Sequence, residues 1–538
     1  MKKLLSIVLS IMMLGSFAAC SQQKTTQASQ EETKPVSTSL PKTDMSKWKY
    51  DSENGFYYQT EIAYCEKPAD ESYENLAIFV PEAYMDATEN SDGTYTCSLN
   101  EKGEMNGYTA SDAPIVMPIA TEGYYAAEPL TETALTEYAP LAKMINDYTS
   151  QGFVYVFAGC RGINEGAPSG VTDLKAAIRY IRYCDDVLAG DSENIFVFGM
   201  SAGGAQSAIL GASGDSELYD PYLEAIGAIQ GVSDAVMGTM AWCPITDLDT
   251  ANAEYEWMMG CTRPGRSVEE NAMSDKLAEA FAEYVNSAGF IDEDGNELTL
   301  SKSENGIFQA GSYYDYIKRV IEKTLENYLS DNDFSDPNLH NSYGSAQGYV
   351  DELNTDKKWV TYDEKTNTVT ITSIADFAEN CKKASDLVVA FDQPEGGNNL
   401  FGYGTREGSH FDRILADILT ELNSKYAAEY NADLAKTDFV GNTVEQRVDM
   451  YAPLYFLMPT RDGYGKSKAA KYWRIRTGIE QNNTSLTTEV NLALALNQSD
   501  GVESVDFETV WAQGHTEAER TGDSTENFIK WVNACAKS

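Results

Sequence analysis

The sequence predicts a protein of the α/β class, in which helices cover both faces of a mostly parallel sheet and a large mixed insertion interrupts the core. Short, wholly apolar segments alternate with amphipathic ones, which is typical of buried strands that alternate with helices. This rhythm stops near residue 250 and returns after residue 457, which indicates the insertion. A chain of 538 residues is long enough for both parts.

Several short strands are predicted before the insertion, in segments rich in aromatic and β-branched residues. They are residues 56–65, 76–80, 94–99, 115–119, 153–158, 194–199 and 236–243. Two helices are predicted among them. Residues 171–185 have apolar residues at helical spacing, and residues 202–210 begin with small residues that allow close packing.

Residues 250–457 form the predicted insertion. Ser274 is expected to cap a helix within it, and a second helix is predicted over residues 312–329. Residues 359–362 and 368–371 have the pattern of a hairpin. Because ligands of open α/β sheets bind outside the carboxyl ends of the strands, we interpret the insertion as a lid or substrate domain that overhangs this edge.

Two further strands, residues 472–477 and 505–511, return to the sheet after the insertion. The predicted core therefore comprises residues 48–249 and 458–538, with the insertion between the two parts.

Residues 1–19 predict an export signal. Lys2 and Lys3 precede an apolar run, and small residues end at Ala19, directly before Cys20. The run is short for a membrane-spanning helix, which needs about 20 apolar residues. The pattern resembles a bacterial lipobox, although Phe17 stands where Leu or Val is usual. The resemblance implies an exported cell-surface lipoprotein that is anchored to the membrane only through a lipid on Cys20.

Residues 20–47 are polar, and we predict a flexible tether there. The formal charge of the chain, −43, excludes a nucleic-acid-binding protein, because phosphate backbones would repel it. The three histidines, His340, His410 and His515, lie far apart, so neither a metal centre nor another cofactor is expected. Apart from Cys20, the cysteines are interpreted as free buried thiols, with Cys243 and Cys261 the first pair to test for a disulfide.

The sharpest motif is a Gly-x-Ser-x-Gly run over residues 199–203. It follows a predicted strand and opens a predicted helix, which is the context of a nucleophile elbow. The motif predicts Ser201 as a nucleophile and the backbone N–H of Ala202 as a donor to an oxyanion. The alternative is a turn of small residues that only allows a helix to pack closely.

His515 follows the last strand, where the base of such a site is expected, whereas His340 and His410 are interpreted as structural. Glu480 is the only carboxylate in the loop after residues 472–477 and is the candidate to orient the histidine. A solvated loop residue is the alternative for Glu480, and the amide of Asn483 could replace it.

The second oxyanion donor is expected in the loop of residues 120–125. Gly123 would let a backbone N–H approach the substrate there, and an ordinary turn is the alternative.

These residues resemble the bacterial subtype-B tannases and related carboxylesterases of the α/β-hydrolase superfamily. The matching stretches are residues 154–156, 159–162, 173–180, 199–204, 243–248, 255–257, 390–392, 400–402 and 473–476. The resemblance implies an α/β-hydrolase fold with Ser201 as nucleophile and His515 as general base.

The family's Asp-x-Asp-Thr run, whose first Asp completes the triad, corresponds here to Gln481-Asn482-Asn483-Thr484. Family members bind the galloyl hydroxyls with a Lys, a Glu and the second Asp of this run. By resemblance Lys383 matches the Lys, the Glu position falls near Gly397, and Asn483 replaces the Asp. Lys383 and Asn483 are thus the candidate substrate-binding residues, and the changed set favours an aromatic or short acyl ester over a galloyl ester.

The leading hypothesis is a lipid-anchored serine esterase that hydrolyses small carboxylic esters through an acyl-enzyme. A peptidase of the prolyl-oligopeptidase type is one alternative, but the segment before residue 110 is too short for the β-propeller that such enzymes carry. The other alternative is a non-catalytic binding lipoprotein on a hydrolase fold, which the missing Asp motivates.

Overall fold

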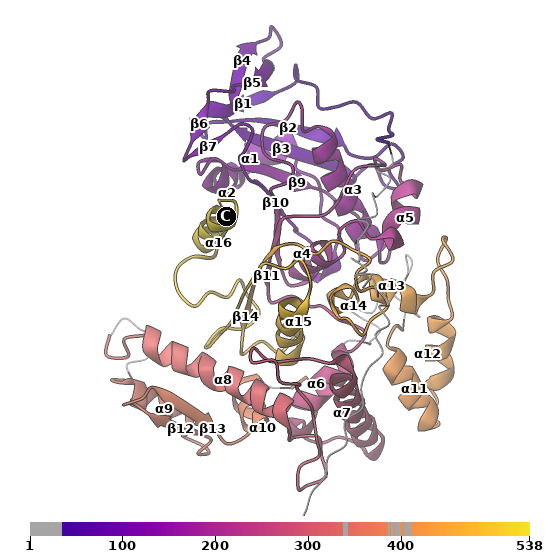
Figure 1. The fold of residues 1–538 in the computed structure, drawn as a ribbon, viewed down its shortest axis with the longest axis vertical. Coiled ribbons are helices and arrows are strands. Elements are labelled where there is room, and N and C mark those ends of the chain that lie inside the picture. Colours follow the sequence, from indigo (N-terminus) through magenta and orange to yellow (C-terminus); the bar gives the residue numbers. More distant parts are fainter. Residues whose placement is uncertain are drawn as a thin grey trace, which may run out of the picture. The chain divides into compact units, whose positions relative to one another are not determined.

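The computed structural model describes residues 35–336, 343–382, 384–385, 388, 392, 400–402 and 410–537. From Val36 onward the described residues form one compact unit (Figure 1). Its central sheet has nine strands, which are, in spatial order, β1 (Lys49–Asp51), β2 (Phe56–Ala63), β3 (Asn75–Pro81), β9 (Val154–Ala158), β8 (Ile115–Pro118), β10 (Ile195–Met200), β11 (Gly238–Trp242), β14 (Tyr472–Gly478) and β15 (Ser504–Val510).

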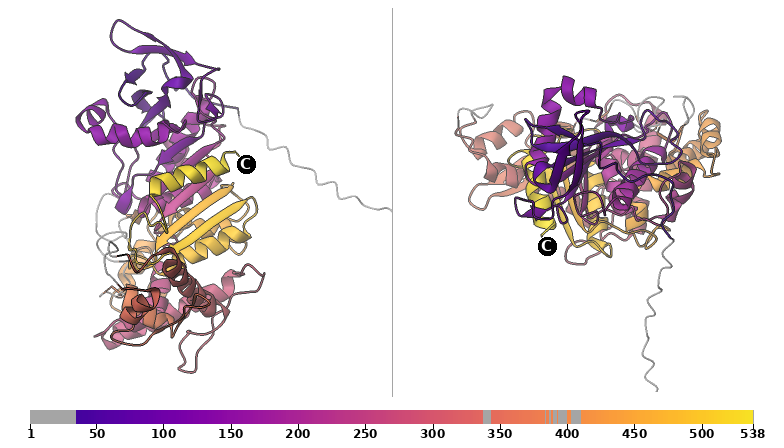
Figure 2. Two further views of the ribbon diagram at one scale, coloured as in Figure 1. Left: turned by 90° about the vertical axis from the view of Figure 1, so that its left-hand side faces the viewer. Right: turned by 90° about the horizontal axis from the view of Figure 1, so that it is seen from above.

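The sheet is antiparallel at its N-terminal edge and parallel elsewhere. Strands β1, β2, β3 and β9 pair antiparallel, whereas every neighbouring pair from β9 to β15 is parallel. The left view of Figure 2 shows the last two strands of the chain side by side in the sheet. The prediction of a mostly parallel sheet covered by helices is confirmed.

The helices of the structure are α1 (Glu132–Glu137), α2 (Ala139–Thr149), α3 (Ser169–Tyr183), α4 (Ala202–Ala212), α5 (Asp220–Ala225), α6 (Ala251–Met259), α7 (Val268–Ala288), α8 (Ser312–Asp331), α9 (Ala346–Leu353), α10 (Ile374–Phe377), α11 (Arg413–Glu421), α12 (Ala427–Leu434), α13 (Val444–Met450), α14 (Pro453–Leu457), α15 (Leu486–Gln498) and α16 (Ser524–Cys535). Three small sheets accompany them, formed by β4 (Met85–Glu89) with β5 (Tyr95–Leu99), β6 (Glu104–Met105) with β7 (Tyr108–Thr109), and β12 (Val360–Asp363) with β13 (Thr368–Ile371).

Both faces of the large sheet are covered. On one face, Tyr148 of α2 and Phe528 of α16 pack against Phe198 of β10, with ring centroids 4.4–6.1 Å apart. On the other face, α14 contacts both α4 and α15, and α4 packs on β10 and β11. Aromatic pairs at such separations add to the stabilisation from burial alone.

The register of the parallel strands brings their carboxyl ends to one edge. Met200 of β10 pairs with Trp242 of β11, Trp242 pairs with Arg476 of β14, and Arg476 pairs with Glu508 of β15. The loops that follow these strands therefore begin side by side, which is where an open α/β sheet places its ligand site.

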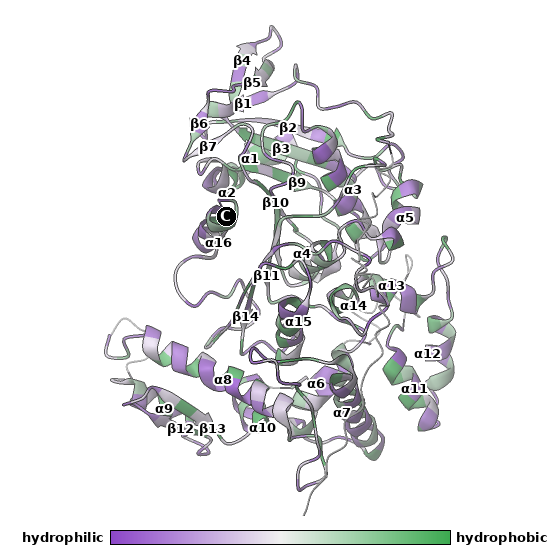
Figure 3. Ribbon diagram, in the orientation of Figure 1, coloured by the Kyte–Doolittle hydropathy of each residue, from purple (hydrophilic) through white to green (hydrophobic). Residues whose placement is uncertain are grey.

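The predicted insertion packs closely against this part of the sheet. Tyr313 of α8 donates a hydrogen bond to Asn491 of α15, and Trp511, just after β15, donates to the hydroxyl of Tyr349 in α9. Figure 3 shows hydrophilic and hydrophobic residues mixed along α8, in agreement with a helix that buries one face. The insertion is thus part of the same compact unit as the core.

Two local predictions differ from the structure. Helix α7 begins at Val268 and is capped by Ser267 in a capping box with Glu270, so Ser274 is not its cap. Ser274 instead lies buried inside the helix and donates to Glu256. The sequence alone favoured Ser274 because it precedes the apolar stripe, but the helix begins earlier, with residues 268–273, none of which is fully buried.

The predicted tether is too long at its C-terminal end. Ser37 forms a β-bridge with Gln230, and Thr43 is buried against Tyr180. Lys42 also forms an ion pair with Asp186 of the core. Residues 36–47 therefore belong to the folded body, although their polar composition resembles a linker. Residues 1–34, including Cys20, lie outside the described residues, and none of the described helices is long and apolar enough to cross a membrane.

Candidate active site

Ser201 lies at a sharp turn between β10 and α4. Its backbone has φ 61° and ψ −124°, a conformation that L-residues rarely adopt outside strained functional turns. The turn is held because the N–H of Ser201 donates to the carbonyl of Trp242 at 2.9 Å. The Ser201 side chain reaches the carboxyl edge of the sheet and is 8% exposed.

The glycine at the start of α4 allows this turn to form. A Cβ atom on Gly203 would lie 2.1 Å from the carbonyl oxygen of Ile119, which belongs to the loop after β8. No larger residue fits there without moving the backbone. The elbow motif is thus explained by the close approach of α4 to the neighbouring loop.

His515 lies directly beside the elbow. Its Nε2 atom is 2.8 Å from Oγ of Ser201, so the hydroxyl can donate a hydrogen bond to the ring. Burial lowers the pKa of His515 below its ordinary value, which favours the neutral ring. A neutral imidazole at this distance can accept the serine proton.

The other ring nitrogen of His515 contacts Gln481. Oε1 of the Gln481 amide is 2.7 Å from Nδ1 of His515, on the side of the ring opposite Ser201. Gln481 follows β14 and is 3% exposed. If Nδ1 carries the proton of the neutral ring, it donates a hydrogen bond to the amide oxygen, and Nε2 is left free to act as a base.

This arrangement corrects the prediction for the orienting residue. Glu480 does not contact His515, because its carboxylate accepts from the backbone N–H of Ala512 and its own N–H donates to the carbonyl of Gln513. Asn483 is exposed in the turn before α15. We expected a carboxylate on the basis of charge, whereas the structure places the neighbouring amide there. The resemblance already aligned Gln481 with the family's first Asp, and this was the signal that could have found it.

The loops that carry Gln481 and His515 touch each other. A Cβ atom on Gly478, at the end of β14, would lie 2.0 Å from the carbonyl oxygen of Gly514. Glycine at position 478 is therefore required for the approach of the two loops. The C-terminal loop is also held by Glu519, which forms two 2.6 Å hydrogen bonds with Arg474 of β14.

Comparisons with known proteins agree with this geometry. The family model BD-FAE matches residues 109–305. The chain is similar to a tannase from Fusobacterium nucleatum, with 28% identity over 89% of this chain and 95% of that chain and a TM-score of 0.66. It is also similar to tannin acyl hydrolase from Lactobacillus plantarum, with 26% identity over 89% and 94% and a TM-score of 0.66. A tannin acyl hydrolase in complex with ethyl gallate matches at 26% identity over 89% and 94%, with a TM-score of 0.67.

The chain has the α/β-hydrolase fold of the bacterial tannases. The resemblance inferred from the sequence motifs is confirmed, and these neighbours support a hydrolase of the esterase type. No curated protein matches the chain.

In this tannase-like fold, the predicted oxyanion donors lie near the elbow. Ala202 is the first residue of α4, so its N–H has no partner within the helix. Gly123 lies in a short helical turn (Glu122–Tyr124) with φ 66°, and this turn packs against α4. The hydroxyl of Tyr124 holds the turn by donating to the carbonyl of Ile245 at 2.6 Å. Donation by Ala202 and Gly123 to an oxyanion stays a prediction.

Cys243 lies next to the histidine loop as a free thiol. Its Sγ atom accepts from the N–H of Gly478 at 3.4 Å and lies 3.2 Å from the carbonyl of Thr516. Cys261 is a free thiol as well, so the candidate disulfide between Cys243 and Cys261 is wrong. Cys65, Cys97, Cys160 and Cys184 are free and buried, in agreement with the preferred interpretation, whereas Cys261 is exposed and Cys381 is only partly buried.

The other predicted residues lie away from Ser201 or outside the described residues. Nδ1 of His410 is 2.8 Å from Asp392, and its ring stacks on Tyr430 at 3.6 Å, so this histidine is held by the insertion. His340, Lys383 and Gly397 lie outside the described residues. The predicted role of Lys383 in substrate binding therefore stays a prediction.

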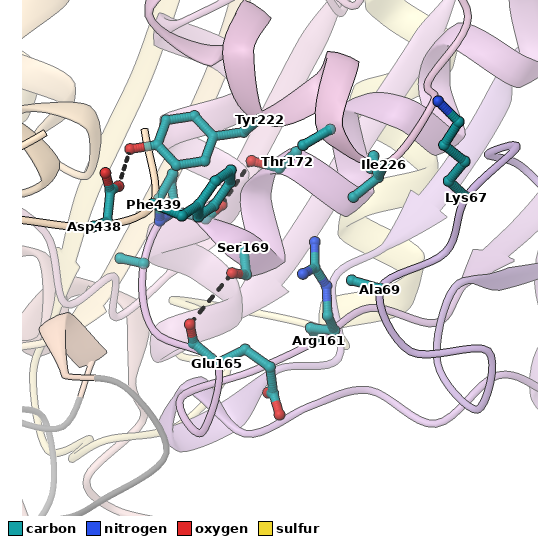
Figure 4. A pocket seen from close by; sticks show the side chains of 13 residues that line it. Lys67, Ala69, Arg161, Glu165, Ser169, Thr172, Tyr222, Ile226, Asp438 and Phe439 are labelled. Atoms are coloured by element: carbon teal, nitrogen blue, oxygen red, sulfur yellow. Dashed lines mark hydrogen bonds between the residues drawn. The ribbon is translucent and has the colours of Figure 1, made fainter. Parts of the chain in front are cut away.

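A separate pocket of about 360 Å³ lies beside Arg161 (Figure 4). Ser201 and His515 do not line it. Arg161 is already bound through two nitrogens to Asp173, at 2.7 and 3.0 Å, and Figure 4 shows Tyr222 donating to Asp438. This pocket is distinct from the elbow site.

Proposed function

We propose that the chain is a serine esterase that hydrolyses carboxylic esters with an aromatic or short acyl group through an acyl-enzyme. The observation that carries this proposal is the 2.8 Å contact between Ser201 Oγ and His515 Nε2 at the strained elbow. A serine hydroxyl is a weak nucleophile unless a base lies within hydrogen-bonding distance. Here the base, the elbow and the esterase-type neighbours point to the same chemistry.

The reaction proceeds in two similar halves. Oγ of Ser201 adds to the ester carbonyl while Nε2 of His515 takes its proton, and the resulting oxyanion accepts from the N–H of Ala202. The intermediate collapses when His515 returns the proton to the departing alkoxide, which leaves an acyl-serine and a free alcohol. Water then adds to the acyl-serine with His515 as base, and the acid and the free serine are released.

Gln481 replaces the carboxylate that usually orients the histidine. Its amide oxygen accepts from Nδ1–H and so fixes the tautomer with a free Nε2. A neutral amide stabilises the imidazolium less than a carboxylate would, because it carries no full charge. The site therefore keeps its geometry, but part of the electrostatic stabilisation must come from elsewhere.

The structures similar to this chain favour aromatic esters as substrates. One neighbour is a tannin acyl hydrolase in complex with ethyl gallate. In this chain Asn483 occupies the position where the family resemblance places a carboxylate that binds the galloyl hydroxyls. We therefore propose aromatic esters with fewer hydroxyl groups, such as hydroxycinnamoyl esters, or short acyl esters, as better substrates than galloyl esters.

The experiment is a panel of methyl gallate, methyl ferulate and short-chain p-nitrophenyl esters, measured with the wild-type chain and with Ser201→Ala. Hydrolysis that is lost in Ser201→Ala supports the esterase, and unchanged hydrolysis refutes Ser201 as the nucleophile. A peptide amide in the same panel tests the peptidase alternative.

The amide at position 481 also favours a second candidate, a non-catalytic binding protein on a hydrolase fold. A fluorophosphonate probe separates the two candidates, because it reacts only with an activated serine. Labelling that is lost in Ser201→Ala supports the enzyme. A folded wild-type protein without label supports the binding protein.

We further propose that the chain is exported and anchored through a lipid on Cys20, on the basis of its N-terminal sequence. Cys20→Ala should then leave the precursor uncleaved or without lipid. The measurements are the mass of the N-terminal peptide and the partition of the protein into a detergent phase. A mature protein that keeps residues 1–19 and carries no lipid would refute the proposal.

A further inference from the structure

A buried carboxylate lies directly behind Gln481. Glu489 is the only acidic residue of α15 and is fully buried. Its Oε1 atom accepts from Nε2 of Gln481 at 2.6 Å, and Gln481 in turn contacts His515. Ser201, His515, Gln481 and Glu489 thus form one continuous chain of hydrogen bonds, with the amide between the ring and the carboxylate.

Two threonine hydroxyls determine the direction of these hydrogen bonds. Thr484 donates to Glu489 Oε1 at 2.9 Å, and Thr477 donates to the same oxygen at 3.2 Å while accepting from Gln481 Nε2 at 2.7 Å. Oε1 of Glu489 is the acceptor in its contacts with both threonines and with Gln481, so the NH₂ group of Gln481 faces Glu489. Its oxygen must then face His515.

The opposite orientation of the amide would block the reaction. If Nε2 of Gln481 faced the ring, it would donate to Nδ1, and the proton of the neutral imidazole would have to sit on Nε2. That nitrogen could then no longer accept the proton of Ser201. The orientation of a single amide therefore decides whether His515 can act as a base.

Burial and Lys382 act in opposite directions on the charge of Glu489. Burial raises the pKa of Glu489 to about 7, and Lys382, which is buried nearby and donates to the carbonyl of Ile479 at 3.3 Å, limits this rise. Glu489 therefore carries its negative charge above about pH 7. Glu480 and the thiols of Cys243 and Cys381 are the other titratable groups around Lys382. Oε2 of Glu489 has no hydrogen-bond partner among the described residues, which is costly for a buried carboxylate.

We propose that Glu489 is a positioning residue for ester hydrolysis: it fixes the amide of Gln481 with its oxygen toward His515 and supplies, through that amide, the negative charge that the imidazolium requires. This inference rests on the proposed esterase function. It assigns to a residue on a neighbouring helix the part that a directly bound carboxylate plays in the usual triad.

The test exchanges the two side chains. Glu489→Gln keeps the shape but removes the charge, and should lower kcat by about 10- to 100-fold with KM nearly unchanged. The double variant Gln481→Glu, Glu489→Gln places the carboxylate directly against Nδ1 of His515 and should recover at least the wild-type kcat. The acid limb of the profile of kcat/KM against pH should move to lower pH in the single variant and to higher pH in the exchange variant.

Glu254→Gln is the matched control. Glu254 of α6 is also a fully buried carboxylate, and it accepts from Thr250, Thr487 and Thr488 without contacting Gln481. Its kcat should stay near that of the wild type. An exchange variant as slow as Glu489→Gln, or an unmoved acid limb, would show that Glu489 is only structural and overturn the inference.

A measurement on the unmodified protein covers the case in which the variants do not fold. Above the pKa of His515, ¹⁵N-histidine NMR should show a protonated Nδ1 and an unprotonated Nε2, and a proton on Nε2 would overturn the inference. Fluorophosphonate labelling of the same samples separates failure of the esterase function from failure of the role of Glu489. Wild-type protein that is not labelled at Ser201 refutes the esterase function. If the wild type is labelled but the acid limb of the exchange variant has not moved, only the role of Glu489 is refuted.

Discussion

The amide oxygen of Gln481 lies 2.7 Å from Nδ1 of His515, in the place where a serine hydrolase usually has a carboxylate. The relationship preserves the geometry of a triad while removing its charge from direct contact with the ring. It makes the strength of the base dependent on how firmly the amide is held, and this leads to measurable expectations.

Replacement of the nucleophile should abolish ester hydrolysis. Ser201→Ala removes the only oxygen that His515 Nε2 contacts in the described chain, and kcat should fall by about 10⁴- to 10⁶-fold. The measurement is p-nitrophenyl acetate hydrolysis with fluorophosphonate labelling. Ser467→Ala is the control, because Ser467 donates to the carbonyl of Ala212 away from the site and its loss should leave the rate unchanged. Equal rates for Ser201→Ala and wild type would contradict the assignment.

Removal of the amide should slow the reaction without loss of the nucleophile. Gln481→Leu keeps the bulk of the side chain but gives Nδ1 of His515 no acceptor, so both ring tautomers become populated. We expect kcat to fall by about 10²- to 10⁴-fold, with KM changed little. Steady-state kinetics on two esters of different acyl size check this. A fall confined to KM would instead indicate a role in substrate binding.

The pH dependence should follow the depressed pKa of His515. Because burial lowers this pKa below the ordinary value of 6.5, the neutral, basic ring persists to lower pH than it would in water. kcat/KM should therefore rise through a midpoint below pH 6.5 and stay level above it. The same shift makes unfolding easier at low pH, since the unfolded chain binds the proton more readily. A midpoint above 6.5 in the kinetic profile would contradict the burial of the ring.

The approach of the two C-terminal loops can be tested with a pair of glycines. Gly478→Ala places a Cβ atom 2.0 Å from the carbonyl of Gly514, so the loops must separate. We expect a loss of about 1–3 kcal/mol in the free energy of unfolding and a lower kcat. Gly514→Ala is the control, because a Cβ there has no atom within 4 Å. Denaturant unfolding and ester kinetics are the measurements, and equal effects of the two substitutions would argue against a tight contact.

Much of the fold could be predicted because the strands have an unusual composition. Residues 153–158 and 194–199 are apolar on both faces, and the structure places them inside the central sheet as β9 and β10. The Gly-x-Ser-x-Gly run could be interpreted because a strand and a helix flank it. In both cases a local pattern reports directly on a local structure.

The parts that were not predicted depend on contacts between distant segments. The packing of Thr43 against Tyr180 leaves no mark on the polar composition of residues 36–47. The partner of His515 depends on which of two neighbouring side chains reaches its ring. Gln481 does so, whereas the carboxylate of Glu480 accepts from the N–H of Ala512. Glu489 could not be linked to the site from spacing, because a helix on the sheet face brings it there.

The elbow and its base come from two parts of the chain that are separated by the whole insertion. Ser201 is in place once β10 and α4 have formed, but His515 arrives only when β14 and β15 have joined the sheet beside β11. Since contacts between such remote segments form late in folding, a partly folded molecule would have an inert serine. Turnover of an ester would consequently report completion of the sheet, and recovery of activity during refolding would follow docking of the C-terminal strands rather than the first collapse of the chain.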